Sequence, residues 1–182
     1  MPANYTFFAL HCAIQNAMGW GDSHLHAFYI GERSGRDRIT IEFPNPEADD
    51  LYVSETRDER RELVADYFGK TIKQCVYGYD FGDNWDHTII FERALSRESK
   101  ASYPQCLAGK NACPPDDCGG VGGYTDLQEI IQNPRHEEHA DMLAWLGLDD
   151  PKEFDTAEFN PTAVEFDNPK TRLAEWNKGF GL

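Results

Sequence analysis

Hydrophobic positions recur at helical spacing near the start of the chain. Between Thr6 and Gly19, apolar side chains stand at positions 7, 10, 14, 17 and 18, which predicts an amphipathic helix over residues 6–18. Thr6 is a typical N-cap residue and Gly19 a typical stop signal. His11 falls on the inner face of this helix.

Alternating, aromatic-rich stretches predict strands over residues 24–30, 38–43, 71–80 and 85–93. The last two flank the residues FGDN and therefore form a hairpin. Side chains alternate between the faces of a strand, so Trp85, His87 and Ile89 share one face. His87 is thus expected on an apolar stripe.

Helical patterns follow the second and fourth of these strands. A charged amphipathic segment predicts a helix over 55–69, and 124–134 and 134–147 are interpreted as two short helices, the second beginning at Pro134. The tail is expected to lie over the surface and to end in a helical turn. Together the elements predict an α+β fold, in which helices 6–18 and 55–69 pack on a small mixed or antiparallel sheet, with an ordered loop and C-terminal helices covering one end.

The segment from Tyr103 to Tyr124, YPQCLAGKNACPPDDCGGVGGY, interrupts regular structure. It combines three cysteines, adjacent prolines, adjacent aspartates and two Gly-Gly pairs. Proline fixes φ and glycine reaches positive φ, so the segment is expected to be an ordered loop, neither helix nor strand. It is the first place to look for a function.

Composition limits the function classes. The chain has 182 residues, 40% of them hydrophobic, so one domain over residues 1–182 is expected. The net charge of -15 opposes direct nucleic-acid binding, because neutralising a phosphate backbone needs clustered Lys and Arg. Basic proteins, cationic ligands and metal ions are better electrostatic partners, although acidity is also a common means of staying in solution.

The sequence also bears on the cellular location and the redox state of the cysteines. No stretch approaches the ~18 apolar residues of a membrane span, and the N-terminus lacks secretory-signal features. We therefore predict a cytoplasmic protein. Five cysteines in a reducing compartment favour free thiols or a metal site over disulfides.

The loop cysteines Cys106, Cys113 and Cys118 are candidate zinc ligands. Zinc takes thiolate and imidazole ligands, and His136 or His139 could supply the fourth. The spacing differs from paired C-x-x-C motifs. The alternative is that these thiols pack as small hydrophobic groups, with a Cys113 to Cys118 bridge on oxidation.

His24 and His26 flank Leu25 on a predicted strand, so both imidazoles leave the same face. They could share a metal ion with His11 or an acid as a third ligand. The alternative interpretation makes them hydrogen-bonded members of a half-buried aromatic sheet.

Asp80 and Asp83 bracket a glycine-containing turn, and His87 follows on the strand. An acid there could orient the histidine as a general base or complete a metal site. Alternatively, the aspartates bind turn amides while Trp85 anchors the hairpin. The sequence contains no phosphate-binding loop, H-E-x-x-H metalloprotease motif or G-x-S-x-G elbow.

Four segments occur in an order that resembles the plasmid pRiA ORF-three-like family, whose members are often labelled transposon-passenger TnpR proteins. They are HCAIQNAMGWGDSHLHAF, YGYDFGDNWDHTIIFE, the loop above and HEEHADMLAWLGLDDPKEFD. The resemblance covers nearly the whole chain and implies no established biochemical activity. In that family the Pro-Pro-acid-Asp-x-Gly-Gly framework looks more characteristic than the thiols. The chain offers no serine nucleophile with clustered arginines, so DNA strand exchange is not expected.

The resemblance also implies a difference at the N-terminus. Similar members usually begin with a further β-hairpin carrying a Trp-Arg-Arg stretch, as part of a grasp-like ββαβ core. We therefore expect either an upstream start codon or an exposed sheet edge that pairs with a second copy.

The sequence supports two hypotheses about the function. The first is a non-catalytic binding or accessory protein of mobile-element origin, in which the loop and the turn form one recognition surface. Its candidate ligand-binding residues are His24, His26, Asp80, Asp83, Trp85, His87, Asp116 and Asp117. The alternative is a metal-dependent hydrolase that uses His24, His26 and His87 with Asp80 or Asp83.

Overall fold

A five-stranded mixed sheet forms the centre of the computed structural model, which describes residues 1–31, 38–44, 55–69 and 71–180. The strand order is β3-β2-β1-β4-β5; β2 and β3 pair in parallel and the other neighbours are antiparallel. The strands are β1 (His26–Ile30), β2 (Ile39–Glu42), β3 (Glu55–Asp58), β4 (Gln74–Tyr79) and β5 (Trp85–Ile90). With the helices described below, the α+β prediction is confirmed.

The β4–β5 hairpin follows the predicted pattern. Tyr77 pairs with His87 and Tyr79 with Trp85, and residues 81–84 form the turn. Side chains at 85, 87 and 89 lie toward the core, whereas those at 86, 88 and 90 are exposed. The period-two rule therefore placed both faces of this strand correctly.

Helix α1 (Phe7–Met18) packs on the sheet and is closed at both ends as the sequence predicts. The Thr6 hydroxyl accepts a hydrogen bond from the Ala9 amide at 3.2 Å. Gly19 has φ 79° and its amide donates to the Gln15 carbonyl. Phe7 meets Phe28 of β1 edge to face, with ring centroids 5.0 Å apart.

The predicted helix over 55–69 is wrong. Its first four residues form strand β3 beside β2, and only a short helix, α2 (Val64–Tyr67), remains. The apolar side chains of this segment still pack on the core: Phe68 is buried and Tyr67 contacts Phe7 at 5.3 Å between ring centroids. The backbone conformation of residues 55–58 is determined by pairing with β2, which is a long-range contact, and not by the local amphipathic pattern.

The C-terminal part begins with α3 (Gly120–Gln132), which starts inside the glycine-rich segment expected to be non-helical. Gly119 and Gly120 turn the chain with φ of 87° and 68°, and the Gly123 amide then donates to the Gly119 carbonyl. Helix α4 (His139–Leu146) begins five residues after Pro134 and ends at Gly147, whose φ is 70°.

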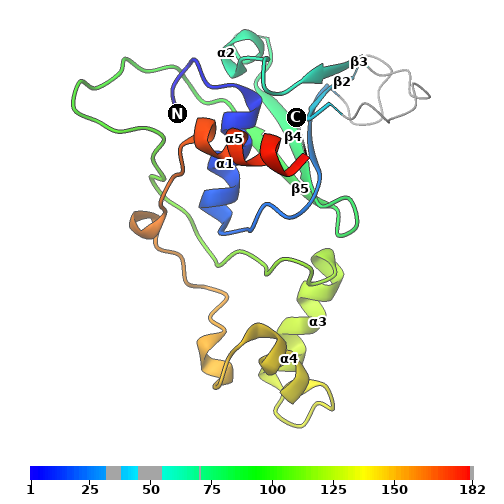
Figure 1. The fold of residues 1–182 in the computed structure, drawn as a ribbon. Helices are drawn as coiled ribbons and strands as arrows, with labels where there is room; N and C mark the ends of the chain where they lie inside the picture. Colours follow the sequence, from blue (N-terminus) through cyan, green and yellow to red (C-terminus); the bar gives the residue numbers. More distant parts are fainter. Residues whose placement is uncertain (32–37, 45–54, 70, 181–182) are drawn as a thin grey trace.

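The tail after α4 returns toward the sheet through two 3-10 turns, η1 (Pro151–Glu153) and η2 (Pro161–Ala163), and ends in α5 (Pro169–Phe180). Figure 1 shows α5 lying across α1, while α3 and α4 pack together at the far end of the molecule. Trp176 of α5 contacts Phe8 of α1 at 5.9 Å between ring centroids. Among the described helices, none has the length and apolar character needed to cross a membrane.

Candidate functional site

The proline-glycine loop and the β4–β5 turn meet directly. The Gly119 amide donates to Asp83 Oδ2 at 2.9 Å. Gly120 lies so close to the Asp83 backbone that a Cβ there would overlap the Asp83 carbonyl oxygen. The end of the loop is therefore fixed on the turn by a hydrogen bond and by close backbone packing.

A third segment, just after α1, holds the same loop. The Gly21 amide donates to Asp116 Oδ2 at 3.0 Å, and Trp20 Nε1 donates to the Pro114 carbonyl at 2.9 Å. The Trp20 ring also stacks on Tyr79 of β4, with centroids 4.7 Å apart. We call the face formed by residues 20–24, 80–85 and 113–120 the loop–turn surface.

The turn itself is organised by Asp80. Its Oδ1 accepts hydrogen bonds from the Gly82 amide at 2.9 Å and the Asp83 amide at 3.3 Å. Asp80 and Asn84 have positive φ values of 52° and 57°, a conformation that Asp and Asn tolerate better than most residues. Trp85 is buried next to the turn, so the predicted structural roles are present for Asp80 and Trp85, whereas Asp83 accepts from the Gly119 amide of the loop instead of a turn amide.

His24 lies between two acids of the loop–turn surface. Its Nε2 is 3.2 Å from Asp117 Oδ1 and 3.8 Å from Asp80 Oδ2. The nitrogen is buried but makes no hydrogen bond among the described residues. The Asp117 side chain is 70% exposed, whereas that of Asp80 is 11% exposed.

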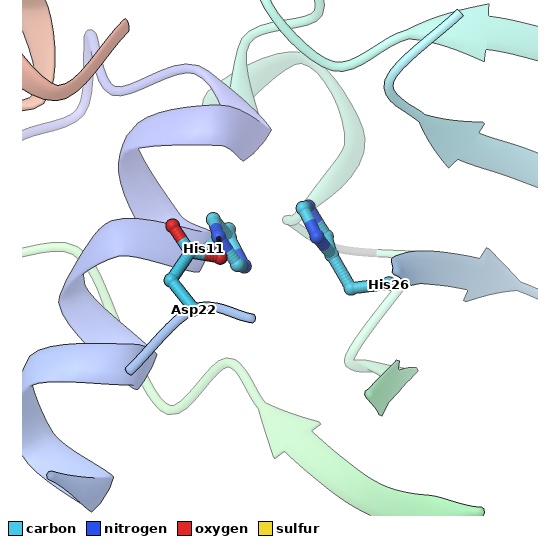
Figure 2. A group of neighbouring side chains, drawn as sticks. All are labelled: His11, Asp22 and His26. Carbon is cyan, nitrogen blue, oxygen red and sulfur yellow. Dashed lines mark hydrogen bonds and ion pairs between the residues drawn. The ribbon is translucent and has the colours of Figure 1, made fainter. Parts of the chain in front are cut away.

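A second polar cluster is buried between α1 and the sheet. Figure 2 shows the imidazoles of His11 and His26 lying face to face, with Asp22 beside His11. The ring centroids are 3.5 Å apart and the planes differ by 3°. All three side chains are at least 95% buried.

His11 belongs to a closed circuit of hydrogen bonds. The Asp22 amide donates to Gln15 Oε1 at 3.1 Å, and Gln15 Nε2 donates to the Tyr77 hydroxyl at 3.0 Å. The circuit closes when Tyr77 donates to His11 Nδ1 at 2.9 Å and His11 Nε2 donates to Asp22 Oδ1 at 2.8 Å. Burial, reinforced by His26, lowers the pKa of His11 to about 4, and the donor and acceptor roles in this circuit are those of the neutral ring.

His26 is held by a different acid. Its Nε2 is 2.7 Å from Glu59 Oε2, and the Glu59 side chain is fully buried. Sequence reasoning missed Gln15, Asp22, Glu59 and Tyr77, because each lies far along the chain from a histidine or carries no motif. The one available signal was His11 on the inner face of α1, since a buried imidazole requires polar partners.

The structure does not bring the three histidines of the hydrolase hypothesis together. His24 faces Asp80 and Asp117, while His26 stacks on His11 in the buried cluster. His87 packs against Trp20 and Tyr77, with centroid distances of 5.4 and 5.7 Å, and burial lowers its pKa. The prediction that His24 and His26 share one ion therefore does not match this geometry.

The candidate zinc ligands do not gather into a three-ligand cluster either. Within the described residues, no three of Cys106, Cys113, Cys118 and His136 bring ligand atoms within 4.8 Å of one another. Cys113 and Cys118 instead pack against the hydrophobic core. Burial raises the pKa of Cys113 to about 12 and also raises that of Cys118, so both thiols stay protonated near neutral pH.

An apolar groove of about 210 Å³ opens beside the loop–turn surface, between α3 and α4. It is lined by Leu127 and Ile130 of α3 and by Met142 and Trp145 of α4, and Asp117, Cys118, Gly123 and Asp126 complete the lining. Trp145 is 47% exposed. No sequence pattern indicated this groove, because it forms only where the two helices pack.

Comparison with known proteins gives consistent matches. Residues 1–163 match the family model described as "Plasmid pRiA4b ORF-3-like protein". The uncharacterized protein y4hQ of Sinorhizobium fredii is 35% identical over 160 residues, which cover 88% of this chain and 76% of that protein. The crystal structure of the protein of unknown function MM3350 from Methanosarcina mazei Go1 is similar with a TM-score of 0.78 and 37% identity, over 91% of this chain and 86% of that chain.

Proposed function

The chain belongs to the plasmid pRiA4b ORF-3-like family, and we propose that it is a non-catalytic binding module, an accessory protein of mobile-element origin. The groove between α3 and α4, bordered by the loop–turn surface, is the proposed binding site. Its partner is a basic, amphipathic segment of another protein.

The observation that carries this proposal is the groove with Trp145 in its lining. At about 210 Å³ it is smaller than the roughly 300–1,000 Å³ typical of small-molecule sites. It suits one or two apolar side chains of a docked helix or strand. Large, rigid aromatic side chains such as Trp145 are also the common anchors of protein interfaces.

Charge selects the kind of partner. Asp117 and Asp126 line the groove, and Arg135 is the only arginine or lysine in residues 116–150. The exposed acids of α3, α4 and the connections next to them are Asp126, Glu129, Glu137, Glu138, Asp141, Asp149 and Asp150. An apolar groove surrounded by acids favours a partner with Lys or Arg beside its apolar side chains.

A catalytic role has less support from the geometry. A nucleophilic thiol needs a lowered pKa, whereas that of Cys118 at the groove is raised. The histidines of the hydrolase hypothesis point into three different environments. Direct nucleic-acid binding is opposed by the net charge of -15.

The proposal is tested with designed peptides and the full chain. Isothermal titration with a helical peptide of leucine and lysine should give saturable binding that weakens as salt increases. Replacement of Trp145 by Ala should weaken this binding at least about tenfold, because an interface anchor is lost. Val121→Ala is the matched control, since Val121 is 69% exposed on α3 and does not line the groove.

Two results would contradict the proposal. One is equal affinity for the basic peptide and a peptide in which every lysine is replaced by glutamate. The other is an unchanged affinity in the folded Trp145→Ala variant. Either result would remove the groove as the binding site.

A further inference from the structure

We propose that His24, Asp80 and Asp117 form a binding site for a divalent transition-metal ion on the loop–turn surface. The three residues come from separate segments: the bend before β1, the end of β4 and the proline-glycine loop. Their potential ligand atoms all lie within 4.8 Å of one another. The proposal does not depend on the groove between α3 and α4.

The distances fit an ion between the side chains. Zinc-like ions bind nitrogen and oxygen ligands at about 2.0–2.2 Å, so neighbouring ligands of a tetrahedral ion are about 3.4 Å apart. The His24 Nε2 separations of 3.2 Å to Asp117 and 3.8 Å to Asp80 bracket that value. A modest adjustment of the exposed Asp117 side chain would equalise them.

The buried cluster around His11 and His26 is less suited to holding a metal ion. Its nitrogen-to-oxygen separations of 2.8 Å at His11 and 2.7 Å at His26 are those of direct hydrogen bonds. Imidazole lone pairs lie in the ring plane, and the two rings are parallel and 3.5 Å apart. Their lone pairs therefore do not converge on one ion, and the surface trio is the better site.

Two of the three ligands are already positioned. Asp80 Oδ1 is engaged by the Gly82 and Asp83 amides, which leaves Oδ2 facing His24. His24 Nε2 is buried without a hydrogen bond among the described residues, and a bound metal ion would give this nitrogen a partner. Two carboxylates held this close also repel each other, and a cation removes that repulsion.

The donor set indicates the class of ion. One imidazole and two carboxylates suit Zn²⁺, Mn²⁺ or Ni²⁺ better than a soft, thiolate-binding ion. Three protein ligands leave at least one position for water or for a group of a partner. A bound ion would join the turn to the loop in addition to the Asp83–Gly119 hydrogen bond.

The test uses the full chain after treatment with a chelator. Isothermal titration with Zn²⁺ and separately with Mn²⁺ should show one saturable ion per chain. His24→Asn and Asp117→Asn should each weaken the affinity for the ion at least about tenfold, since each removes a ligand. Asp66→Asn removes one exposed carboxylate on α2, outside the groove and the proposed metal site, and should change that affinity by no more than about twofold.

Several results would overturn the site. Absence of saturable binding at millimolar ion is one, and undiminished binding in folded Asp117→Asn is another. Asp117 is 70% exposed and its carboxylate pairs with His24 at the surface, so this variant should fold even if His24→Asn does not. Loss of Co²⁺ absorption only in a Cys113→Ser, Cys118→Ser double variant would assign the ion to thiolates instead.

Discussion

His11 and His26 stack with parallel rings, yet each imidazole is bonded to its own acid. His11 is paired with Asp22 at 2.8 Å and His26 with Glu59 at 2.7 Å. The arrangement joins α1, β1 and the turn after β3 through polar contacts inside the core. A buried polar group without a partner costs roughly 1–3 kcal/mol. Substitutions that remove one member of this network should therefore weaken the packing of α1 on the sheet.

The first prediction concerns acid stability. The pKa of His11 falls from 6.5 to about 4 on folding, so the unfolded chain binds more protons between these values. Stability from this group is therefore fully present above pH 6.5 and is lost as the pH falls toward 4, by at most about 3 kcal/mol. Urea unfolding at pH 7 and pH 4.5 should show this loss, and the loss should be smaller in His11→Asn. A wild-type protein equally stable at both values would contradict it.

The second prediction concerns the hydroxyl of Tyr77. Tyr77→Phe removes a group that bonds both His11 and Gln15. It should lower the free energy of unfolding by about 1–3 kcal/mol, because two buried polar atoms lose a partner. Tyr103→Phe, whose hydroxyl accepts one exposed bond at 3.4 Å, should change it by no more than about 0.5 kcal/mol. Equal effects in thermal or urea unfolding would argue against the circuit.

The third prediction compares two glycines of one helix. Gly120→Ala places a Cβ against the Asp83 carbonyl at φ 68° and should destabilise the protein by about 1–3 kcal/mol. Gly122→Ala has nothing within 4 Å of the added Cβ and should leave stability unchanged or raise it by up to about 1 kcal/mol.

Hydrogen exchange followed by mass spectrometry can show whether release of the loop accounts for the loss of stability in Gly120→Ala. Gly120→Ala should increase exchange in residues 113–124, because the loop is released from the turn. Gly122→Ala should not. Unchanged loop protection in Gly120→Ala would show that the loop does not depend on this contact.

Local signals explain which parts of the fold could be predicted. Helix α1 was found because its apolar period and its caps at Thr6 and Gly19 are local, and β4 and β5 were found because alternation and turn residues are local too. Strand β3 was missed because its conformation depends on pairing with β2. The same limit applies to the buried cluster, whose members Tyr77 and Glu59 lie 66 and 33 positions from their histidines.

The candidate site shows a similar division. Composition indicated that the loop would be ordered, and the turn chemistry of Asp80 followed from its sequence. The pairing of His24 with Asp117 depends on how the loop folds back onto the turn, and no spacing encodes it. The zinc-site prediction used the number and spacing of the cysteines, whereas the chemistry of Cys113 depends on its burial, which the sequence does not encode locally.

Binding of a basic amphipathic segment in the groove beside the loop–turn surface can be checked most directly by mapping the contact residue by residue. Backbone and indole NMR signals of the isotope-labelled chain can be followed during titration with the leucine–lysine peptide. We expect shifts confined to Asp117, Leu127, Met142, Trp145 and their neighbours, and no shift at His26. Shifts centred on another face, or none at saturating peptide, would contradict it.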